Sequence, residues 1–306
     1  MRGSAVRPVV VVAAMAALAS IAAAQPAANP EVATQPAAKP EAAQPAKLLF
    51  GAKSTPTQGP ARAIGFYTRG CLSGAVELPV DGPHWQVMRL SRNRNWGHPN
   101  LVAMIEHLAT RLPEVGGWQG ILVGDLAQPR GGPTVTGHAS HQIGLDADIW
   151  VTPFPDHKLS REEREDMAPM NVVAADWNDI NPANWTPQHV ALYKAASEEP
   201  SVERVLVNPA VKKALCRDTK GDRSWLRKLR PWYGHEDHIH VRISCPAGHK
   251  ECRPQPPVPP GDGCDKSLDW WFSKEARTPP KPPAKPPRPI MLADLPTACA
   301  AVLHAP

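Results

Sequence analysis

Strict period-two alternation over residues 238–243 constrains the fold more than any other feature of the chain. The segment reads His-Ile-His-Val-Arg-Ile. Successive side chains of a β-strand point to opposite faces, so the apolar positions would share one buried face and the polar positions the other. The polar face would consist of His238, His240 and Arg242. Two imidazoles on one face are typical of a metal ligand beside a proton-transfer group, so the segment predicts a half-buried strand with a reactive site.

A second segment, residues 137–148, is dense in side chains of the metal-binding types. His141 and Asp148 are seven positions apart, so on one straight strand they would face opposite ways. Gly144 between them permits a turn, which would place His141 in a loop and Asp148 on the strand that follows. His141 and Asp148 could then converge with His240. Two nitrogens and one carboxylate oxygen would hold one zinc ion and leave its fourth position open for water.

The hydrophobic pattern of the rest of the chain predicts an α+β domain. In residues 99–112, apolar side chains recur at helical spacing and share one face. The predicted helices are 99–112, 160–167, 187–198 and 208–216. The predicted strands are 119–125, 146–152 and 239–244. The sequence contains no Gly-rich phosphate loop and no Gly-x-Ser-x-Gly motif, which argues against nucleotide binding and against a serine nucleophile of that type.

Composition divides the 306 residues into four parts. Residues 1–24 have a basic start, an apolar stretch and three alanines at the end, the pattern of a cleaved export signal. Residues 25–47 are rich in Ala, Pro and Gln and are predicted to form a disordered linker. Residues 48–275 are long enough for one domain with its own core. Residues 276–306 are predicted to be a Pro-rich basic tail, and no later stretch is predicted to cross a membrane.

Six cysteines fit an oxidising compartment and permit three disulfides. They allow fifteen connectivities, which the sequence alone does not resolve. Cys245 and Cys252 are seven positions apart across a Pro-Gly turn and are the most probable local pair. The other four are Cys71, Cys216, Cys264 and Cys299. Zinc-ribbon ligation is disfavoured because the chain has no Cys-x-x-Cys spacing.

The formal charge of +5 comes mostly from the tail, where residues 277–289 include four basic side chains and no acid. Proline interrupts this stretch and no aromatic residues are interleaved with it, so nucleic-acid binding is disfavoured. Either loose attraction to an anionic cell wall or membrane surface, or simple solvation, would account for the charge.

Four segments together resemble one known family. His-x6-Asp followed far downstream by His-x-His is the ligand pattern of the LAS superfamily of zinc peptidases, and the wider match is to the penicillin-insensitive murein endopeptidases (peptidase family M74). The likeness runs from about Ala61 to Cys264. The segments that carry it are residues 92–99 (RNRNWGHP), 124–132 (GDLAQPRGG), 140–149 (SHQIGLDADI) and 232–242 (WYGHEDHIHVR).

The resemblance implies a LAS- or hedgehog-like α+β metallopeptidase domain with a central, mostly antiparallel sheet flanked by helices. It implies a zinc held by His141, Asp148 and His240, with His238 as the catalytic base and His235 as a supporting catalytic histidine. The implied reaction is hydrolysis of D-alanyl–meso-diaminopimelyl cross-links of peptidoglycan in the periplasm, unaffected by β-lactams. The rivals are a D,D-carboxypeptidase or dipeptidase of the same superfamily and a zinc-bearing wall-binding protein without turnover. The disulfide pairs that the resemblance favours are Cys216–Cys264 and Cys71–Cys299.

The roles of two further groups of residues stay open. The sequence also allows assembly into a homo-oligomer. His138 would either bind a second metal, with Asp176 or Asp179, or orient Asp146; the family has histidine where this chain has Asp179. The second group would either bind substrate carboxylates or form structural salt bridges with Asp125 and surface acids. It consists of Arg92, Arg94 and Arg130.

Overall fold

The computed structural model describes residues 41–278, 281, 283, 285 and 287–306. The predicted export signal and residues 25–40 of the predicted linker lie outside the described residues. In the part that is described, no helix is long and apolar enough to span a bilayer.

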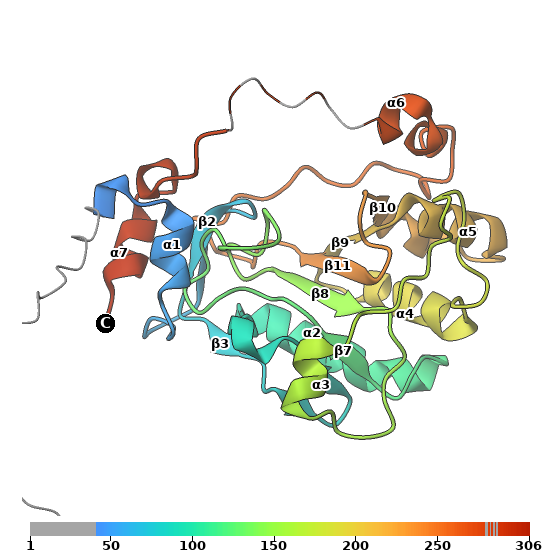
Figure 1. Cartoon of the computed structure of the whole chain (residues 1–306), viewed down its shortest axis with the longest axis horizontal. Coiled ribbons are helices and arrows are strands. Elements are labelled where there is room, and N and C mark those ends of the chain that lie inside the picture. Colours follow the sequence, from blue (N-terminus) through green and yellow to red (C-terminus); the bar gives the residue numbers. More distant parts are fainter. Residues whose placement is uncertain (1–40, 279–280, 282, 284, 286) are drawn as a thin grey trace, which may run out of the picture. The chain divides into compact units, whose positions relative to one another are not determined.

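Seven strands form the main sheet in the order β10–β9–β11–β8–β7–β5–β4 (Figure 1). Four of its six strand pairs are antiparallel, and β10–β9 and β5–β7 are parallel. The strands are β4 (Asp81–Gly82), β5 (Trp85–Val87), β7 (Ile121–Val123), β8 (Asp146–Trp150), β9 (Val202–Val207), β10 (Leu229–Pro231) and β11 (His238–Ile243). Two small antiparallel sheets pair β1 (Arg62–Phe66) with β2 (Arg69–Ser73) and β3 (Val76–Glu77) with β6 (Trp96–Gly97).

The four predicted helices are present as α2 to α5. α2 begins where Pro99 fixes the first turn and the His98 side chain accepts a hydrogen bond from the Asn100 N–H. The α-helices are α1 (Ala46–Gly51), α2 (Pro99–Arg111), α3 (Arg161–Asp166), α4 (Pro187–Glu198), α5 (Pro209–Asp218), α6 (Lys274–Arg277) and α7 (Ala298–His304). The α+β prediction with a mostly antiparallel sheet is therefore confirmed.

One face of the main sheet packs against α2 and α4. Ile149 of β8 and Val241 of β11 are fully buried in one hydrophobic cluster with Ile105 of α2 and Leu192 of α4. Because side chains alternate along each strand, the residues between these apolar positions point to the opposite face. That opposite face of β8 and β11 is where the polar side chains gather.

The end of the chain packs onto the small β1–β2 sheet. Cys299 of α7 is disulfide-bonded to Cys71 of β2, and both are fully buried in a cluster that includes Phe50 of α1. The predicted tail 276–306 therefore ends in a packed segment, because the disulfide and this apolar cluster hold α7 against the domain. All three disulfides that the sequence and the resemblance indicated are present: Cys71–Cys299, Cys216–Cys264 and Cys245–Cys252.

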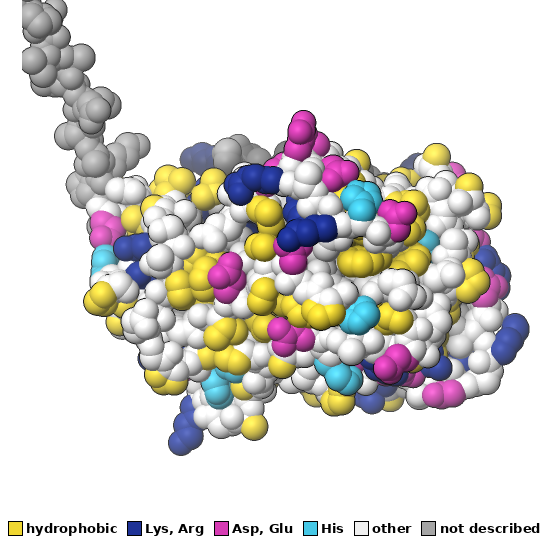
Figure 2. Space-filling view, turned by 90° about the horizontal axis from the view of Figure 1, so that it is seen from below, with side chains coloured by type: hydrophobic (Ala, Val, Ile, Leu, Met, Phe, Trp, Pro, Cys, Tyr) yellow, Lys and Arg dark blue, Asp and Glu magenta, His cyan; other side chains and the backbone are white. Residues whose placement is uncertain are grey.

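The face of the molecule seen in Figure 2 carries basic and acidic side chains interspersed with apolar and neutral ones. On this face the charges do not gather into one basic field of the kind that binds nucleic acid.

Candidate active site

The register of β8 against β11 brings the two predicted segments together. Asp148 pairs with His240, and Asp146 pairs with Arg242. Paired residues of adjacent strands project to the same face, so two carboxylates of β8 lie beside an imidazole and a guanidinium of β11. The convergence predicted for His240 and Asp148 follows directly from this pairing.

His141 reaches the same place from the loop before β8. Gly144 has φ +70°, and a Cβ there would lie 2.4 Å from the Leu72 side chain, so the turn requires glycine. His141 itself has φ +66°, an unfavourable conformation for a residue with a Cβ. Its backbone N–H donates to Asp146 Oδ2 at 3.1 Å. This bond helps to hold a strained backbone that aims the His141 ring at the strands.

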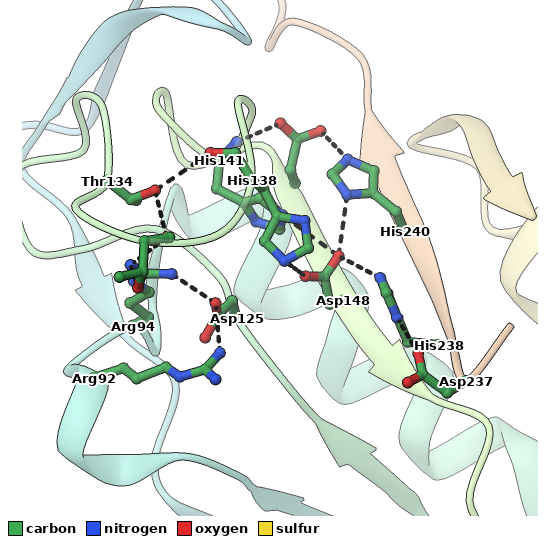
Figure 3. A network of polar contacts seen from close by, with 12 residues as sticks. Arg92, Arg94, Asp125, Thr134, His138, His141, Asp148, Asp237, His238 and His240 are labelled. Atoms are coloured by element: carbon green, nitrogen blue, oxygen red, sulfur yellow. Dashed lines mark hydrogen bonds and ion pairs between the residues drawn. The ribbon is translucent and has the colours of Figure 1, made fainter. Parts of the chain in front are cut away.

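Asp148 is the hub of the cluster, and in Figure 3 the dashed lines converge on its carboxylate. Oδ1 lies 3.0 Å from His240 Nδ1, 3.4 Å from His141 Nε2 and 3.9 Å from His238 Nε2. Oδ2 lies 3.1 Å from His138 Nε2. Burial would raise the pKa of Asp148, but the surrounding imidazoles, His141 first among them, hold it well below its usual range. The carboxylate is therefore ionised.

His240 lies between two carboxylates. Its Nδ1 contacts Asp148, and its Nε2 lies 3.1 Å from Asp146 Oδ1. Burial opposes a charged imidazole, but the two carboxylates raise the pKa of His240 to about 9. Asp146 is in turn held by Arg242, whose Nε donates to Oδ1 at 2.6 Å. Asp146 and Arg242 thus fix the position of the His240 ring from behind.

His238 has a partner that the sequence reading did not identify. The Nδ1–H of His238 donates to Asp237 Oδ1 at 2.6 Å, which leaves Nε2 directed toward Asp148. Burial alone would lower the pKa of His238, but Asp237 and Asp148 raise it. The only sequence signal was the acid directly before the histidine. That signal is weak, because adjacent residues of a strand point to opposite faces and would not contact each other. Asp237 can reach His238 because it lies just before β11 begins.

His235 lies in the turn that leads into β11. Gly234 and His235 both have positive φ, and the His235 ring lies 4.9 Å from that of His238 between centroids. His235 Nδ1–H donates to the Tyr233 carbonyl at 3.1 Å. Burial, together with the neighbouring His238 and His240, lowers the pKa of His235 to about 4. The His235 ring is therefore neutral at neutral pH and packs directly against His238.

His138 belongs to the main cluster and not to a separate one. Among the described residues, ligand atoms of His138, His141 and Asp148 form a group within 4.8 Å, and Asp176 and Asp179 are not part of it. Asp179 instead pairs with Arg217, and Asp176 accepts hydrogen bonds from Asn178. His138 contacts Asp148 and is not hydrogen-bonded to Asp146, so neither predicted role for His138 matches its place in the structure.

The three arginines that the sequence offered as carboxylate anchors are held by the protein itself. Arg92 and Arg94 both donate to Asp125 Oδ2, at 3.1 and 2.7 Å, the salt-bridge alternative (Figure 3). Arg130 has a structural role in place of the expected substrate role. Its buried guanidinium donates through Nε, Nη1 and Nη2 to backbone carbonyls of Thr55 and of the last residues of the chain, which anchors the C-terminus.

The cluster opens into a cleft of about 680 Å³. The mouth is aromatic: Trp232 is 57% exposed, and its ring lies 6.2 Å from that of Trp271 between centroids. Arg204 and Arg230, which the sequence did not indicate as site residues, also line the cleft. Their positions in β9 and β10 become informative only once the order of the strands is known.

The donors in the cluster fit a metal ion. Both ring nitrogens of His141 and the Nε2 of His238 are buried without a hydrogen-bond partner in the structure, an arrangement that is costly unless something else satisfies them. Imidazole nitrogens and a carboxylate oxygen are the donor set that zinc binds in hydrolytic sites. The residues therefore suit a metal ion beside the cleft.

This fold and this site define the class: an α+β domain with a candidate metal centre beside an open cleft. The family model described as penicillin-insensitive murein endopeptidase matches residues 63–304. Three relatives carry the name penicillin-insensitive murein endopeptidase. The Klebsiella pneumoniae subsp. pneumoniae protein is 43% identical over 248 residues, covering 81% of this chain and 88% of the relative. The Yersinia enterocolitica protein is 43% identical, covering 81% and 87%. The Haemophilus influenzae protein is 42% identical, covering 81% and 84%. The chain belongs to the penicillin-insensitive murein endopeptidase family.

Proposed function

We propose that this protein is a zinc-dependent endopeptidase that hydrolyses D-alanyl–meso-diaminopimelyl cross-links of peptidoglycan in the periplasm. The observation that carries the proposal is the group of imidazoles around the buried Asp148 carboxylate, of which those of His138, His238 and His240 line an open cleft. Family membership supports the substrate class. The export-signal pattern of residues 1–24 and the three disulfides support an oxidising compartment outside the cytosol.

His141, Asp148 and His240 would hold the zinc ion, and His138 lies close enough to Asp148 to share in its coordination. When bound, zinc acts as a Lewis acid that polarises the scissile carbonyl and lowers the pKa of water. Asp146 and Arg242 keep the His240 ring oriented, as residues behind metal ligands commonly do.

His238 is proposed as the general base. Its Nδ1–H bond to Asp237 fixes the tautomer and leaves Nε2 free to accept a proton from the attacking water. Asp237 also stabilises the imidazolium that results. The same Nε2 then gives the proton to the departing amine. His235 is neutral and packed against the His238 ring, so it would hold the base in position without repelling the charge that forms on it.

No serine nucleophile takes part in this scheme. β-Lactams act by acylating a serine, so the reaction should continue in their presence. The aromatic residues that line the cleft, Trp232 and Trp271 among them, would offer apolar faces to the substrate.

Mass spectrometry of digested, cross-linked muropeptide dimers tests the function. An endopeptidase converts each dimer into two monomers, whereas a D,D-carboxypeptidase releases only terminal D-alanine, and a wall-binding protein leaves the dimers intact. We expect monomers, with or without a β-lactam. Intact dimers after prolonged incubation with metal-replete protein would refute the proposal.

A further inference from the structure

A row of paired residues runs across the main sheet from the metal-binding cluster to a cationic side chain. Asp148 of β8 pairs with His240 of β11, His240 with Leu206 of β9, and Leu206 with Arg230 of β10. His240, Leu206 and Arg230 all line the cleft. Strands lie ~4.8 Å apart, so the backbone of Arg230 lies roughly 10 Å from that of His240.

Arg230 is the member of this region whose charge has no partner. Arg242 is bound to Asp146, and Arg204 donates to Glu203 at 2.6 Å. The Arg230 guanidinium makes no hydrogen bond or ion pair with any residue in the described part of the chain. Its Nη1 lies 3.2 Å from where a Cβ would be at Gly263, so the absence of a side chain at that position leaves space for the guanidinium.

The electrostatic surroundings of Arg230 favour an anion. Burial lowers its pKa, and so does the neighbouring charge of Arg204; Asp265 opposes this at longer range, but its carboxylate is hydrogen-bonded to Ser267. Three arginines line the cleft, and among its described lining residues there is no aspartate or glutamate. A neutral substrate would leave the positive charge of the half-buried Arg230 without a counter-charge.

We propose that Arg230 is a specificity-determining residue that binds a carboxylate of the substrate, with Arg204 beside it adding to the positive potential. The proposal rests on the proposed function. The carboxylate would lie on the part of the substrate that extends from the cleaved bond across β9 toward β10. Leu206 would contact the apolar stretch between the two. A guanidinium holds a carboxylate through two parallel hydrogen bonds, which gives geometric selectivity for a stem peptide that carries a free diaminopimelyl carboxylate.

Two substrates and two proteins test this. The substrates are a cross-linked stem-peptide dimer with free diaminopimelyl carboxylates and the same dimer with those carboxylates amidated. For wild-type protein we expect kcat/KM to be roughly 10- to 100-fold lower on the amidated dimer, the scale of a lost charge-assisted hydrogen bond. Arg230→Gln should lower kcat/KM on the free-acid dimer by the same factor, mainly through KM, and change it little on the amidated dimer.

Two variants separate recognition from folding. Arg230→Lys keeps the charge and should retain part of the preference for the free acid. Arg161→Gln removes one positive charge from exposed α3, outside the cleft lining, and should change neither rate. Equal losses on both dimers in Arg230→Gln would overturn the proposal, because Arg230 would then act through structure. No loss on the free-acid dimer would overturn it as well.

The affinity of the protein for the same two dimers, measured by calorimetry, tests the carboxylate site independently of the proposed catalytic function. It is measured on full-length His238→Ala protein with and without Arg230→Gln. If wild-type protein cleaves neither dimer, the proposed function fails; tighter binding of the free-acid dimer, abolished by Arg230→Gln, would still uphold the carboxylate site. Equal affinity for the two dimers with Arg230 intact would overturn the site, whether or not the protein cleaves them.

Discussion

The three disulfides close loops of very different length, and their removal should destabilise the protein in that order. Cys71–Cys299 spans 228 residues, Cys216–Cys264 spans 48 and Cys245–Cys252 spans 7. A cross-link restricts the unfolded chain, and the chain-entropy relation gives stabilisations of about 5, about 4 and about 2 kcal/mol for these loops at room temperature.

The test is a pair of double substitutions. Cys71→Ala with Cys299→Ala should lower the free energy of unfolding by about 5 kcal/mol, and Cys245→Ala with Cys252→Ala by about 2 kcal/mol. The difference in unfolding free energy should widen further, because Cys71 and Cys299 are both fully buried between α7 and β2, whereas Cys245 is only partly buried. Urea unfolding followed by tryptophan fluorescence gives both values, provided the slopes with urea are compared.

Equal losses for the two double variants would refute the loop-length reasoning. A larger loss for the short loop would show that strain or local packing governs these bonds. The hydrogen bonds from Arg130 to the last carbonyls remain in both variants, so the C-terminus keeps that anchor in each case. Urea unfolding of the wild-type protein under reducing conditions is the control, because it breaks the disulfides without replacing the cysteine side chains.

Three other changes have definite expected outcomes. Arg164→Met should lower the free energy of unfolding by about 3–5 kcal/mol, because it leaves an acidic partner and several backbone carbonyls without their buried donor; Arg161→Met, on the exposed face of the same helix, should cost little in the same urea titration. Burial lowers the pKa of His189 below the ordinary histidine value of 6.5. The stability that the neutral, folded His189 contributes is therefore fully present above about pH 6.5 and is lost as the pH falls, because the unfolded chain then takes up a proton. His189→Gln should therefore flatten the decline in unfolding midpoint between about pH 7 and about pH 5, and an unchanged slope would contradict this. Asp237→Asn should lower kcat roughly 10- to 100-fold with metal content unchanged; loss of the metal would show that Asp237 supports a ligand and not the base.

The local pattern was sufficient to predict the elements that carry the site. Alternation alone predicted that Ile239, Val241 and Ile243 share the face that joins the hydrophobic core. The expectation of a half-buried strand was wrong, because His240 and Arg242 on the other face are buried too, in a polar cluster with Asp146 and Asp148. The turn at Gly144 was predictable because few other residues tolerate its φ. The predicted strand at 119–125 is shorter in the structure, Ile121–Val123, since only those residues are paired in the sheet.

What the sequence did not predict depends on contacts between distant segments. Arg130 resembles a substrate anchor until α7 folds back and presents its carbonyls. Arg230 reaches the cleft only because β10 pairs with β9 in a particular register. His138 joins the Asp148 cluster because its loop folds over β8. No local periodicity reports on such pairings, since each is decided by the packing of the whole domain.

Metal content and turnover of two variants test the central claim most directly. His238→Ala should retain zinc, because His141, Asp148 and His240 remain, yet cleave cross-linked dimers roughly 10²- to 10⁴-fold more slowly. His240→Ala should lose both the metal and the activity, and wild-type protein should bind about one zinc per chain and stop on chelation. Full activity of metal-stripped wild-type protein would contradict the account. So would a His238→Ala variant that has lost its zinc together with a His240→Ala variant that has kept it.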